Sequence, residues 1–131
     1  MSRFAPLRRR AAATALLLAA ALYLAAPVAA RSPPDTLPEV VLADLPKEAR
    51  DVYMLIGKGG PFRYDRDGIA FGNREKLLPA QSRGYYHEYT VPTPGAKNRG
   101  ARRIICGGPA TTPAACWYTG DHYRSFRRIR E

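Results

Sequence analysis

The sequence predicts an α+β fold in which one N-terminal helix packs on a twisted antiparallel β-sheet. Two observations support this class. One segment carries apolar residues at helical spacing, and the chain after it consists of short runs rich in aromatic and β-branched residues. Short connections between the later runs favour antiparallel neighbours.

The helix is expected within PKEARDVYMLIGKGG, residues 46–60. Pro46 suits the first turn, where its missing N–H breaks no hydrogen bond, and the glycines that close the segment end the helix. The apolar positions recur at helical spacing and form one face: Ala49, Val52, Tyr53 and Ile56.

The remaining elements are expected to be strands. A tight turn near Gly120 and Asp121 is expected to join the last two. The expected strands are RDGIAF (66–71), GYYHEYTV (84–91), RRIIC (102–106), CWYTG (116–120) and HYRSFRRI (122–129).

The first 30 residues have the features of a secretory signal peptide. Arginines precede an apolar run over residues 11–26, and Val28 and Ala30 occupy the −3 and −1 positions of a cleavage site. The alternative is an uncleaved membrane anchor, but this run is shorter than the roughly 20 residues of a bilayer span. We therefore expect a signal peptide over 1–30, an irregular lead-in over 31–42 and one domain over 43–131, secreted without stable membrane association.

Without residues 1–30, the chain keeps 17 Lys and Arg against 11 Asp and Glu, a net charge of +6. A secreted basic domain suits a polyanionic partner such as nucleic acid or an anionic surface. Solubility alone would explain the same charge, so charge does not separate these interpretations.

Cys106 and Cys116 are separated by nine residues in a chain expected to meet an oxidising compartment. If strands flank the intervening loop, a disulfide can form across the hairpin, provided that the Cα atoms lie within about 7 Å. The alternative is a buried free thiol at Cys106 with Cys116 exposed. Two cysteines and two histidines at no zinc-like spacing predict no structural metal site.

His87 and Glu88 are neighbours in the sequence, but side chains alternate between the two faces of a strand. If Glu88 faces a cleft, then His87 faces away, and the other histidine, His122, becomes the candidate proton partner of Glu88. If residues 99–105 are extended, Arg99 and Arg103 share one face. A carboxylate, an imidazole and two guanidinium groups can cleave a phosphodiester through the ribose 2′-hydroxyl without a metal.

These residues lie in longer motifs, and the chain resembles the secreted bacterial guanyl-specific ribonucleases related to barnase over roughly residues 43–131. The resemblance implies cleavage of single-stranded RNA on the 3′ side of guanosine, through a 2′,3′-cyclic phosphate to a 3′-phosphate, with no cofactor. It implies Glu88 as general base, His122 as general acid, and Arg99 and Arg103 as the phosphate clamp. The motifs that carry it are LPKEARDVYMLI, GPFRYDRDGIAFGNRE, LPAQSRGYYHEYTVPTPGAKNRGARRIICGG and YTGDHYRSFRRI.

The resemblance also implies that the loop FGNRE reads guanine. Glu75 would accept hydrogen bonds from the guanine N1–H and exocyclic amine, and backbone N–H groups around Asn73 and Arg74 would meet O6. Aromatic and cationic side chains would frame the base and its phosphate, with Arg66 as an accessory phosphate contact. The implied substrate-binding residues are Phe71, Gly72, Asn73, Arg74, Glu75, Tyr123 and Arg66.

Two residues depart from the family pattern. Gly72 stands where relatives usually carry a larger polar residue, and Lys76 stands where a small residue is common. Gly72 could therefore relax the choice of base. The resemblance further implies a monomer and an acidic, barstar-like protein inhibitor.

Two alternatives to a metal-independent ribonuclease stay open at this point. A non-catalytic cationic protein that binds RNA or anionic envelopes would explain the charge and the export. A metal-dependent nuclease would use His87, Glu88, Asp121 and His122.

Overall fold

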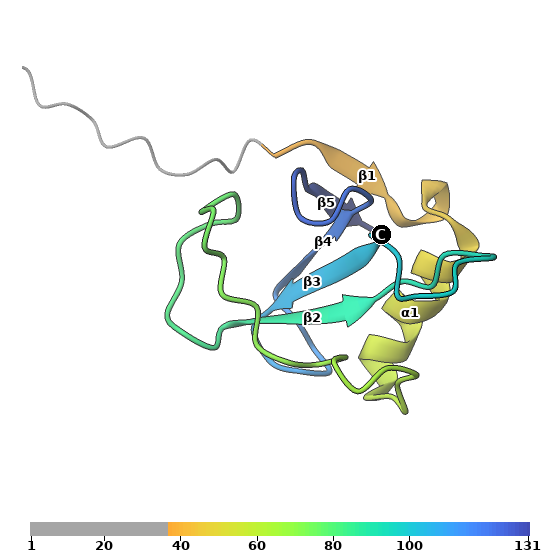
Figure 1. The fold of residues 1–131 in the computed structure, drawn as a ribbon. Helices are drawn as coiled ribbons and strands as arrows, with labels where there is room; N and C mark the ends of the chain where they lie inside the picture. The colour runs from red at the N-terminus through yellow and green to blue at the C-terminus, as the bar shows by residue number, and fades with distance from the viewer. Residues whose placement is uncertain (1–36) are drawn as a thin grey trace, which may run out of the picture.

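The protein is described here by a computed structural model that covers residues 37–131. The predicted signal peptide and the first half of the predicted lead-in, residues 31–36, lie outside these residues. The described part contains one α-helix and one five-stranded sheet of order β1-β5-β4-β3-β2 (Figure 1). The elements are β1 (Glu39–Val41), a 3-10 turn η1 (Leu42–Asp44), α1 (Lys47–Lys58), β2 (Tyr86–Thr90), β3 (Arg103–Gly107), β4 (Ala115–Thr119) and β5 (Arg127–Arg130).

The predicted fold class is confirmed, with one correction at the edge of the sheet. β2, β3, β4 and β5 are antiparallel neighbours, but β1 pairs with β5 in parallel. The lead-in is therefore not irregular throughout. Val40 is buried in the core, and the Arg128 N–H donates to the carbonyl of Pro38 at 2.7 Å. This segment is held by the burial of one apolar side chain and by main-chain pairing with a distant strand. Its own sequence does not indicate a strand.

Two predicted strands are wrong in part. Residues 66–71 follow the free edge of β2, where the Phe71 N–H donates to the Tyr86 carbonyl at 2.8 Å, but they form only an isolated bridge at Ala70. Gly68, with φ +87°, interrupts a regular ladder. The last strand begins at Arg127 rather than at His122, so a seven-residue loop replaces the predicted tight turn after β4.

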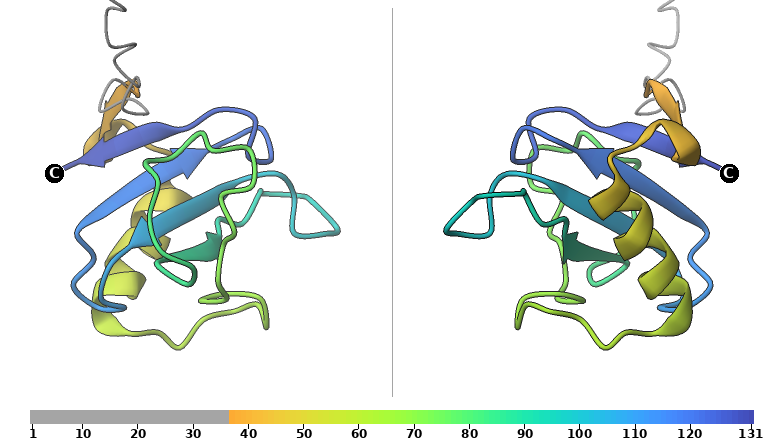
Figure 2. Two further views of the ribbon diagram at one scale, coloured as in Figure 1. Left: turned by 90° about the vertical axis from the view of Figure 1, so that its left-hand side faces the viewer. Right: turned by 90° about the vertical axis from the view of Figure 1, so that its right-hand side faces the viewer.

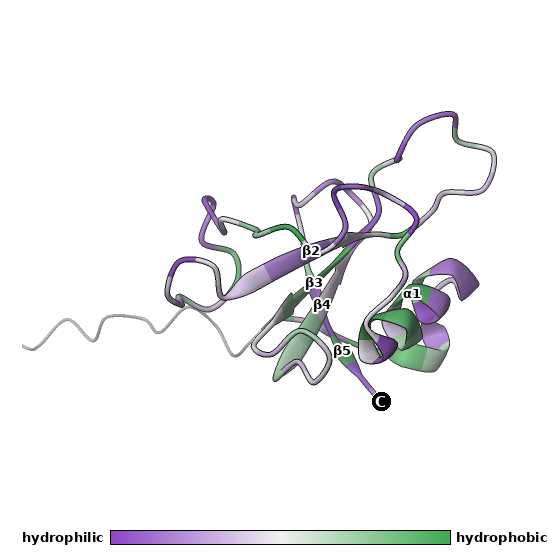
Figure 3. Cartoon of the chain, turned by 90° about the horizontal axis from the view of Figure 1, so that it is seen from below, coloured by the Kyte–Doolittle hydropathy of each residue, from purple (hydrophilic) through white to green (hydrophobic). Residues whose placement is uncertain are grey.

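Helix α1 agrees with its predicted apolar face. Ala49 and Ile56 are buried, and Figure 3 shows hydrophobic residues of α1 toward the sheet and hydrophilic ones on its outer side. Pro46 lies at the N-cap rather than inside the first turn. Gly59 ends the helix in the left-handed conformation, with φ 81°, which a glycine adopts without a Cβ clash. Within residues 37–131, no helix is long and apolar enough to cross a bilayer.

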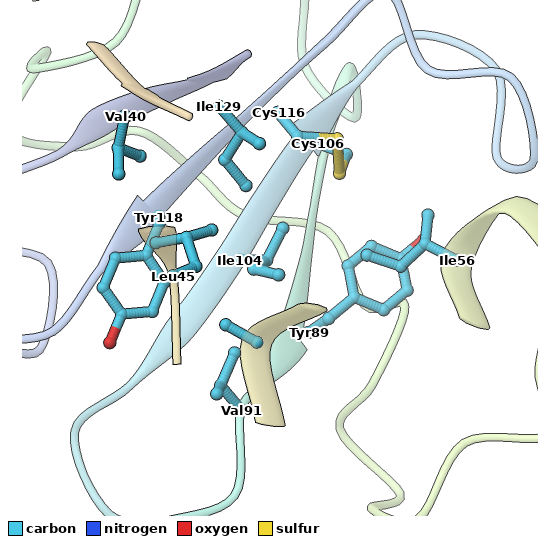
Figure 4. Packing of buried hydrophobic residues seen from close by; sticks show 11 residues of the cluster. Val40, Leu45, Ile56, Tyr89, Val91, Ile104, Cys106, Cys116, Tyr118 and Ile129 are labelled. Carbon is cyan, nitrogen blue, oxygen red and sulfur yellow. A yellow bond between two sulfur atoms is a disulfide. The ribbon is translucent and has the colours of Figure 1, made fainter. Parts of the chain in front are cut away.

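The face of the sheet that meets α1 carries the main apolar core, shown in Figure 4. Ile104 is fully buried at its centre, and Cys106 lies directly opposite Cys116 across the β3–β4 pair. Their Cα atoms are 4.1 Å apart and the sulfurs are bonded, which confirms the predicted disulfide. The core residues shown in the figure are Val40, Leu45, Ala49, Ile56, Tyr89, Val91, Ile104, Cys106, Cys116, Tyr118 and Ile129.

The opposite face is covered by the chain between α1 and β2, as the two views of Figure 2 show. Leu78 of this segment packs on Tyr86, Ile105 and Trp117 in a second, smaller apolar cluster. The buried polar side chains of the described residues also share this face, because cross-strand pairs project to the same side. They are Glu88, Thr90, Arg103 and Thr119.

Candidate active site

A cavity of about 780 Å³ opens on the sheet face opposite α1. Two segments far apart in the sequence form its walls: the loop that precedes β2 and the loop between β4 and β5. Nine of the predicted site residues line it: Arg66, Phe71, Gly72, Asn73, Arg74, Glu75, Glu88, His122 and Tyr123.

Glu88 is the carboxylate at the bottom of this cavity. It lies in the middle of β2, is only 5% exposed, and projects to the face opposite α1. Its Oε2 accepts a hydrogen bond from the Tyr123 hydroxyl at 2.6 Å, and its Oε1 lies 3.3 Å from Nη2 of Arg99. Nε of Arg66 lies 3.7 Å from the same oxygen. A buried carboxylate with these partners is held in one orientation, as a proton acceptor requires.

The backbone positions of Arg99 and Arg103 differ from those that the sequence predicted. Arg99 lies in the loop before β3, not on an extended strand, and donates through Nε and Nη2 to Oγ1 of Thr90 at 3.0 and 2.8 Å. The predicted strand-face relation between the two arginines is therefore wrong, because β3 begins only at Arg103. Neither arginine lines the cavity: Arg99 contacts Glu88 there, and Arg103 reaches the ring of Tyr123.

Arg103 is 2% exposed, and main-chain carbonyls hold its guanidinium. Its Nη1 donates to the carbonyls of Arg99, Gly100 and Arg102 at 3.3, 3.0 and 2.7 Å. Its Nε has no hydrogen-bond partner, and no carboxylate of residues 37–131 forms an ion pair with it. A buried cation with an unused donor is costly unless an anion completes it.

His122 enters the cavity from the loop between β4 and β5. It and Tyr123 have left-handed backbones, with φ 55° and 70°. Such angles are uncommon for residues other than glycine and are incompatible with the predicted strand. The His122 N–H donates to the Ala101 carbonyl at 3.0 Å, and the Tyr123 N–H donates to Oγ1 of Thr119 at 3.2 Å. These bonds hold the backbone of the histidine beside the cavity that Glu88 also lines.

Asp121 organises the same loop and is not free to act elsewhere. Its carboxylate accepts hydrogen bonds from the hydroxyl and N–H of Ser125, at 2.5 and 2.9 Å, and from the hydroxyl of Thr119 at 2.9 Å. These bonds, led by the one from the Ser125 hydroxyl, lower the pKa of Asp121 to about 2 against a weaker opposing effect of burial. The residue therefore stays ionised and fixes the loop that carries His122.

Tyr123 joins the catalytic end of the cavity to its aromatic wall. Its ring stacks on Phe71 with centroids 5.2 Å apart, and Phe126 meets the same Phe71 edge-on at 6.1 Å. Burial raises the pKa of Tyr123, and its hydrogen bond to Glu88 raises it further. The hydroxyl thus stays protonated and donates to the carboxylate.

The loop of residues 71–75 is shaped by Asn73. With φ 49°, Asn73 uses its side-chain amide to donate to the Leu78 carbonyl at 3.0 Å and to accept from the Leu78 N–H at 3.1 Å. The side chain therefore fixes the turn and leaves the exposed Arg74 and Glu75 at the cavity. No side chain at Gly72 narrows the entrance.

His87 takes no part in this cavity. It lies opposite Cys106 in the β2–β3 register, on the face that α1 covers. Within residues 37–131, no three His, Cys, Asp or Glu side chains gather as they would to hold a metal ion. The four residues of the metal-dependent alternative are therefore not brought together.

Some residues of the cavity wall were not predicted from the sequence. Arg124 lines the wall beside Tyr123, and Phe126 completes the aromatic contact with Phe71. In the sequence, Arg124 belongs to a basic C-terminal run, RSFRRIR (124–130), and its place in the cavity wall depends on a left-handed loop that sequence patterns do not indicate.

Comparisons with known proteins agree with this architecture. Guanyl-specific ribonuclease Sa3 of Kitasatospora aureofaciens is 57% identical over 90 residues, which cover 69% of this chain and 62% of that protein. Guanyl-specific ribonuclease Sa of the same organism is 56% identical over 90 residues, covering 69% of this chain and 91% of that protein.

A solved structure shares the fold as well. The crystal structure of ribonuclease Sa2 with guanosine-2′-cyclophosphate superposes with a TM-score of 0.65 at 45% identity, covering 72% of this chain and 96% of that one. The sequence model of the ribonuclease family matches residues 29–130. The chain therefore belongs to the ribonuclease family.

Proposed function

We propose that this protein is an endoribonuclease that cleaves single-stranded RNA on the 3′ side of guanosine without a metal ion. The observation that carries the proposal is the shared cavity. A buried, oriented carboxylate at Glu88 and an imidazole at His122 line the same space as the loop of residues 71–75. Relatives that are 56% and 57% identical are named guanyl-specific ribonucleases.

The first step is an intramolecular transfer at phosphorus. Glu88 takes the proton of the ribose 2′-hydroxyl, the 2′-oxygen forms a bond to phosphorus, and the bond from phosphorus to the leaving 5′-oxygen breaks. His122 gives its proton to that oxygen. The product is a 2′,3′-cyclic phosphate; water then reopens it with the two roles reversed and leaves a 3′-phosphate. The structure of ribonuclease Sa2 with guanosine-2′-cyclophosphate supports this order of reaction steps by analogy.

Arg99 and Arg103 are proposed to stabilise the charge that builds on the phosphoryl oxygens. Arg99 contacts Glu88, and the buried Arg103 has an Nε donor without a partner. Cations fixed before the reaction stabilise a developing charge most effectively in a site shielded from water. A phosphate would supply the anion that Arg103 lacks.

Guanine is proposed to bind between Phe71, Tyr123 and the loop that ends in Glu75. The carboxylate of Glu75 is exposed in the cavity and can accept two hydrogen bonds from the N1–H and amino group of guanine. Adenine has no donor at N1, so the same carboxylate rejects it. Because Gly72 has no side chain, the choice of guanine over adenine depends on Glu75 and the loop backbone.

We further propose that the enzyme acts outside the cell as a monomer after residues 1–30 are removed. The arginine-rich start, the apolar run and the small residues at the cleavage site support export. The net charge of +6 over residues 31–131 suits RNA and also an acidic, barstar-like inhibitor that covers the cationic cavity.

Digestion of a defined oligoribonucleotide, with products identified by mass spectrometry, tests the function. We expect cuts after guanosine, cyclic and then 3′-phosphate ends, full activity in EDTA and no cleavage of the matching DNA. Loss of activity in EDTA would contradict the metal-independent mechanism. Binding without cleavage would instead favour a non-catalytic RNA-binding protein.

A further inference from the structure

Arg124 is a cation in the cavity wall that the proposed chemistry does not use. It lines the cavity with Glu88 and His122, and it is exposed. Its side chain forms no hydrogen bond or ion pair with any of residues 37–131, whereas Arg66 and Arg99 both lie within ion-pair distance of Glu88. The guanidinium is therefore available to a ligand.

The backbone on both sides of Arg124 is held by hydrogen bonds. The preceding Tyr123 N–H is bound to Thr119, and the following Ser125 N–H is bound to Asp121 at 2.9 Å. Such a residue loses less conformational freedom on binding than one on a free loop.

Arg124 lies on a different segment of the chain from Arg99 and Arg103, which are proposed to bind the phosphate that is cleaved. Tyr123 and Phe126, on either side of it in the chain, both contact Phe71, so the segment follows the aromatic wall. The groups around the cleaved phosphate come instead from the middle of β2, the loop before β3 and the first residue of β3: Glu88, Arg99 and Arg103. A dinucleotide such as GpN contains one phosphate, which Arg99 and Arg103 are proposed to bind.

We propose that Arg124 binds a second, uncleaved phosphate of the RNA and so gives the enzyme a preference for substrates longer than a dinucleotide. This inference rests on the proposed ribonuclease activity. The second phosphate lies either on the 5′ side of the guanosine or on the 3′ side of the leaving nucleotide, and both offer the same anion to the guanidinium. The contact is a positioning interaction and takes no part in proton transfer.

The test compares Arg124→Ala with the wild-type enzyme on GpN, NpGpN and GpNpN. One arginine–phosphate contact at a surface predicts a three- to tenfold loss of kcat/KM on at least one trinucleotide beyond any loss on GpN, mostly through KM. The slope of log kcat/KM against log salt should fall by about 0.7 for that trinucleotide. The trinucleotide that responds identifies the side on which the phosphate lies, and Arg124→Lys should restore part of the loss.

Arg127→Ala is the matched control. This substitution removes the same charge as Arg124→Ala. The Arg127 guanidinium, however, lies 5.5 Å from the centroid of the Tyr118 ring, on the face of the sheet that α1 covers. The slope of log kcat/KM against log salt should be the same for Arg127→Ala as for the wild type. Equal losses on GpN and on both trinucleotides, or equal salt slopes for the Arg124 and Arg127 variants, would overturn the inference. A wild-type protein that cleaves none of the three would instead refute the proposed function.

Discussion

The two faces of the β-sheet are built from adjacent residues but have opposite chemistry. The face toward α1 is an apolar core closed by a disulfide, with Ile104 fully buried and Tyr89 and Tyr118 packed beside it. The other face contains a small apolar cluster and the buried polar residues of the cavity. His87 and Glu88, neighbours on β2, fall on different faces.

This difference shows how a domain of fewer than 100 described residues separates stability from reactivity. Buried polar and charged groups are costly, so a chain of this size can hold a few only if the rest of its core is secure. Here α1 and the Cys106–Cys116 bond secure one face, and the other can hold a buried Glu88 and an incompletely paired Arg103. Changes on the two faces should therefore affect different properties.

The largest expected effect comes from Glu88→Gln. Gln retains the shape but cannot accept the 2′-hydroxyl proton, so kcat/KM on GpN should fall by roughly 10²–10⁴. His87→Gln, one residue away on the helix face, should change kcat/KM by less than about threefold. Steady-state kinetics on the two variants, with thermal unfolding to show that both are folded, measure the contrast. Equal losses at the two positions would refute the assignment of the two faces.

The second-largest effect is expected on the free energy of unfolding, from a change on the sheet face that α1 covers. The double variant Cys106→Ala/Cys116→Ala loses a cross-link that closes a short loop, which should lower the free energy of unfolding by about 2–3 kcal/mol. For a domain of this size the melting temperature should fall by roughly 10–20 °C.

Activity of this double variant on GpN is the sharper measurement. The sulfurs lie on the face opposite the cavity, so kcat/KM per folded molecule at 20 °C should stay near the wild-type value. A large loss of activity in a fully folded variant would show that the two faces are not independent.

The smallest effect is expected from Asp121→Asn, which weakens the loop that carries His122. The folded-state pKa of Asp121, about 2, lies below its ordinary value of 3.8, so its ionised form stabilises the fold. That contribution is complete above the ordinary value and disappears as pH falls from 3.8 through about 2. At pH 7 the variant should melt roughly 2–5 °C lower than the wild type.

A pH series of melting temperatures checks the sign of this effect. The gap between wild type and Asp121→Asn should be constant from pH 7 to about 5 and should close toward pH 2. A gap that widened on acidification would contradict the hydrogen bonds from Ser125 and Thr119 as its cause.

Local patterns were sufficient for the elements whose side-chain periodicity is regular. Ala49 and Ile56 revealed the buried side of α1, and strand alternation separated Glu88 from His87. The pairing of Cys106 with Cys116 also followed, because two antiparallel strands joined by a short loop bring such residues opposite each other. For the candidate site, the resemblance to a family supplied the roles and the base-binding loop, and the cavity contains most of those residues.

The sequence by itself determined the fold class, the helix, three strands and the chemical types in the site, since these depend on residue type and periodicity. Only the tertiary structure decided the parallel edge strand β1, the loop position of Arg99 and the left-handed turn at His122 and Tyr123. It also decided that Arg124 lines the cavity. Each of these depends on hydrogen bonds between segments distant in the chain, such as that from His122 to Ala101, which no local pattern encodes.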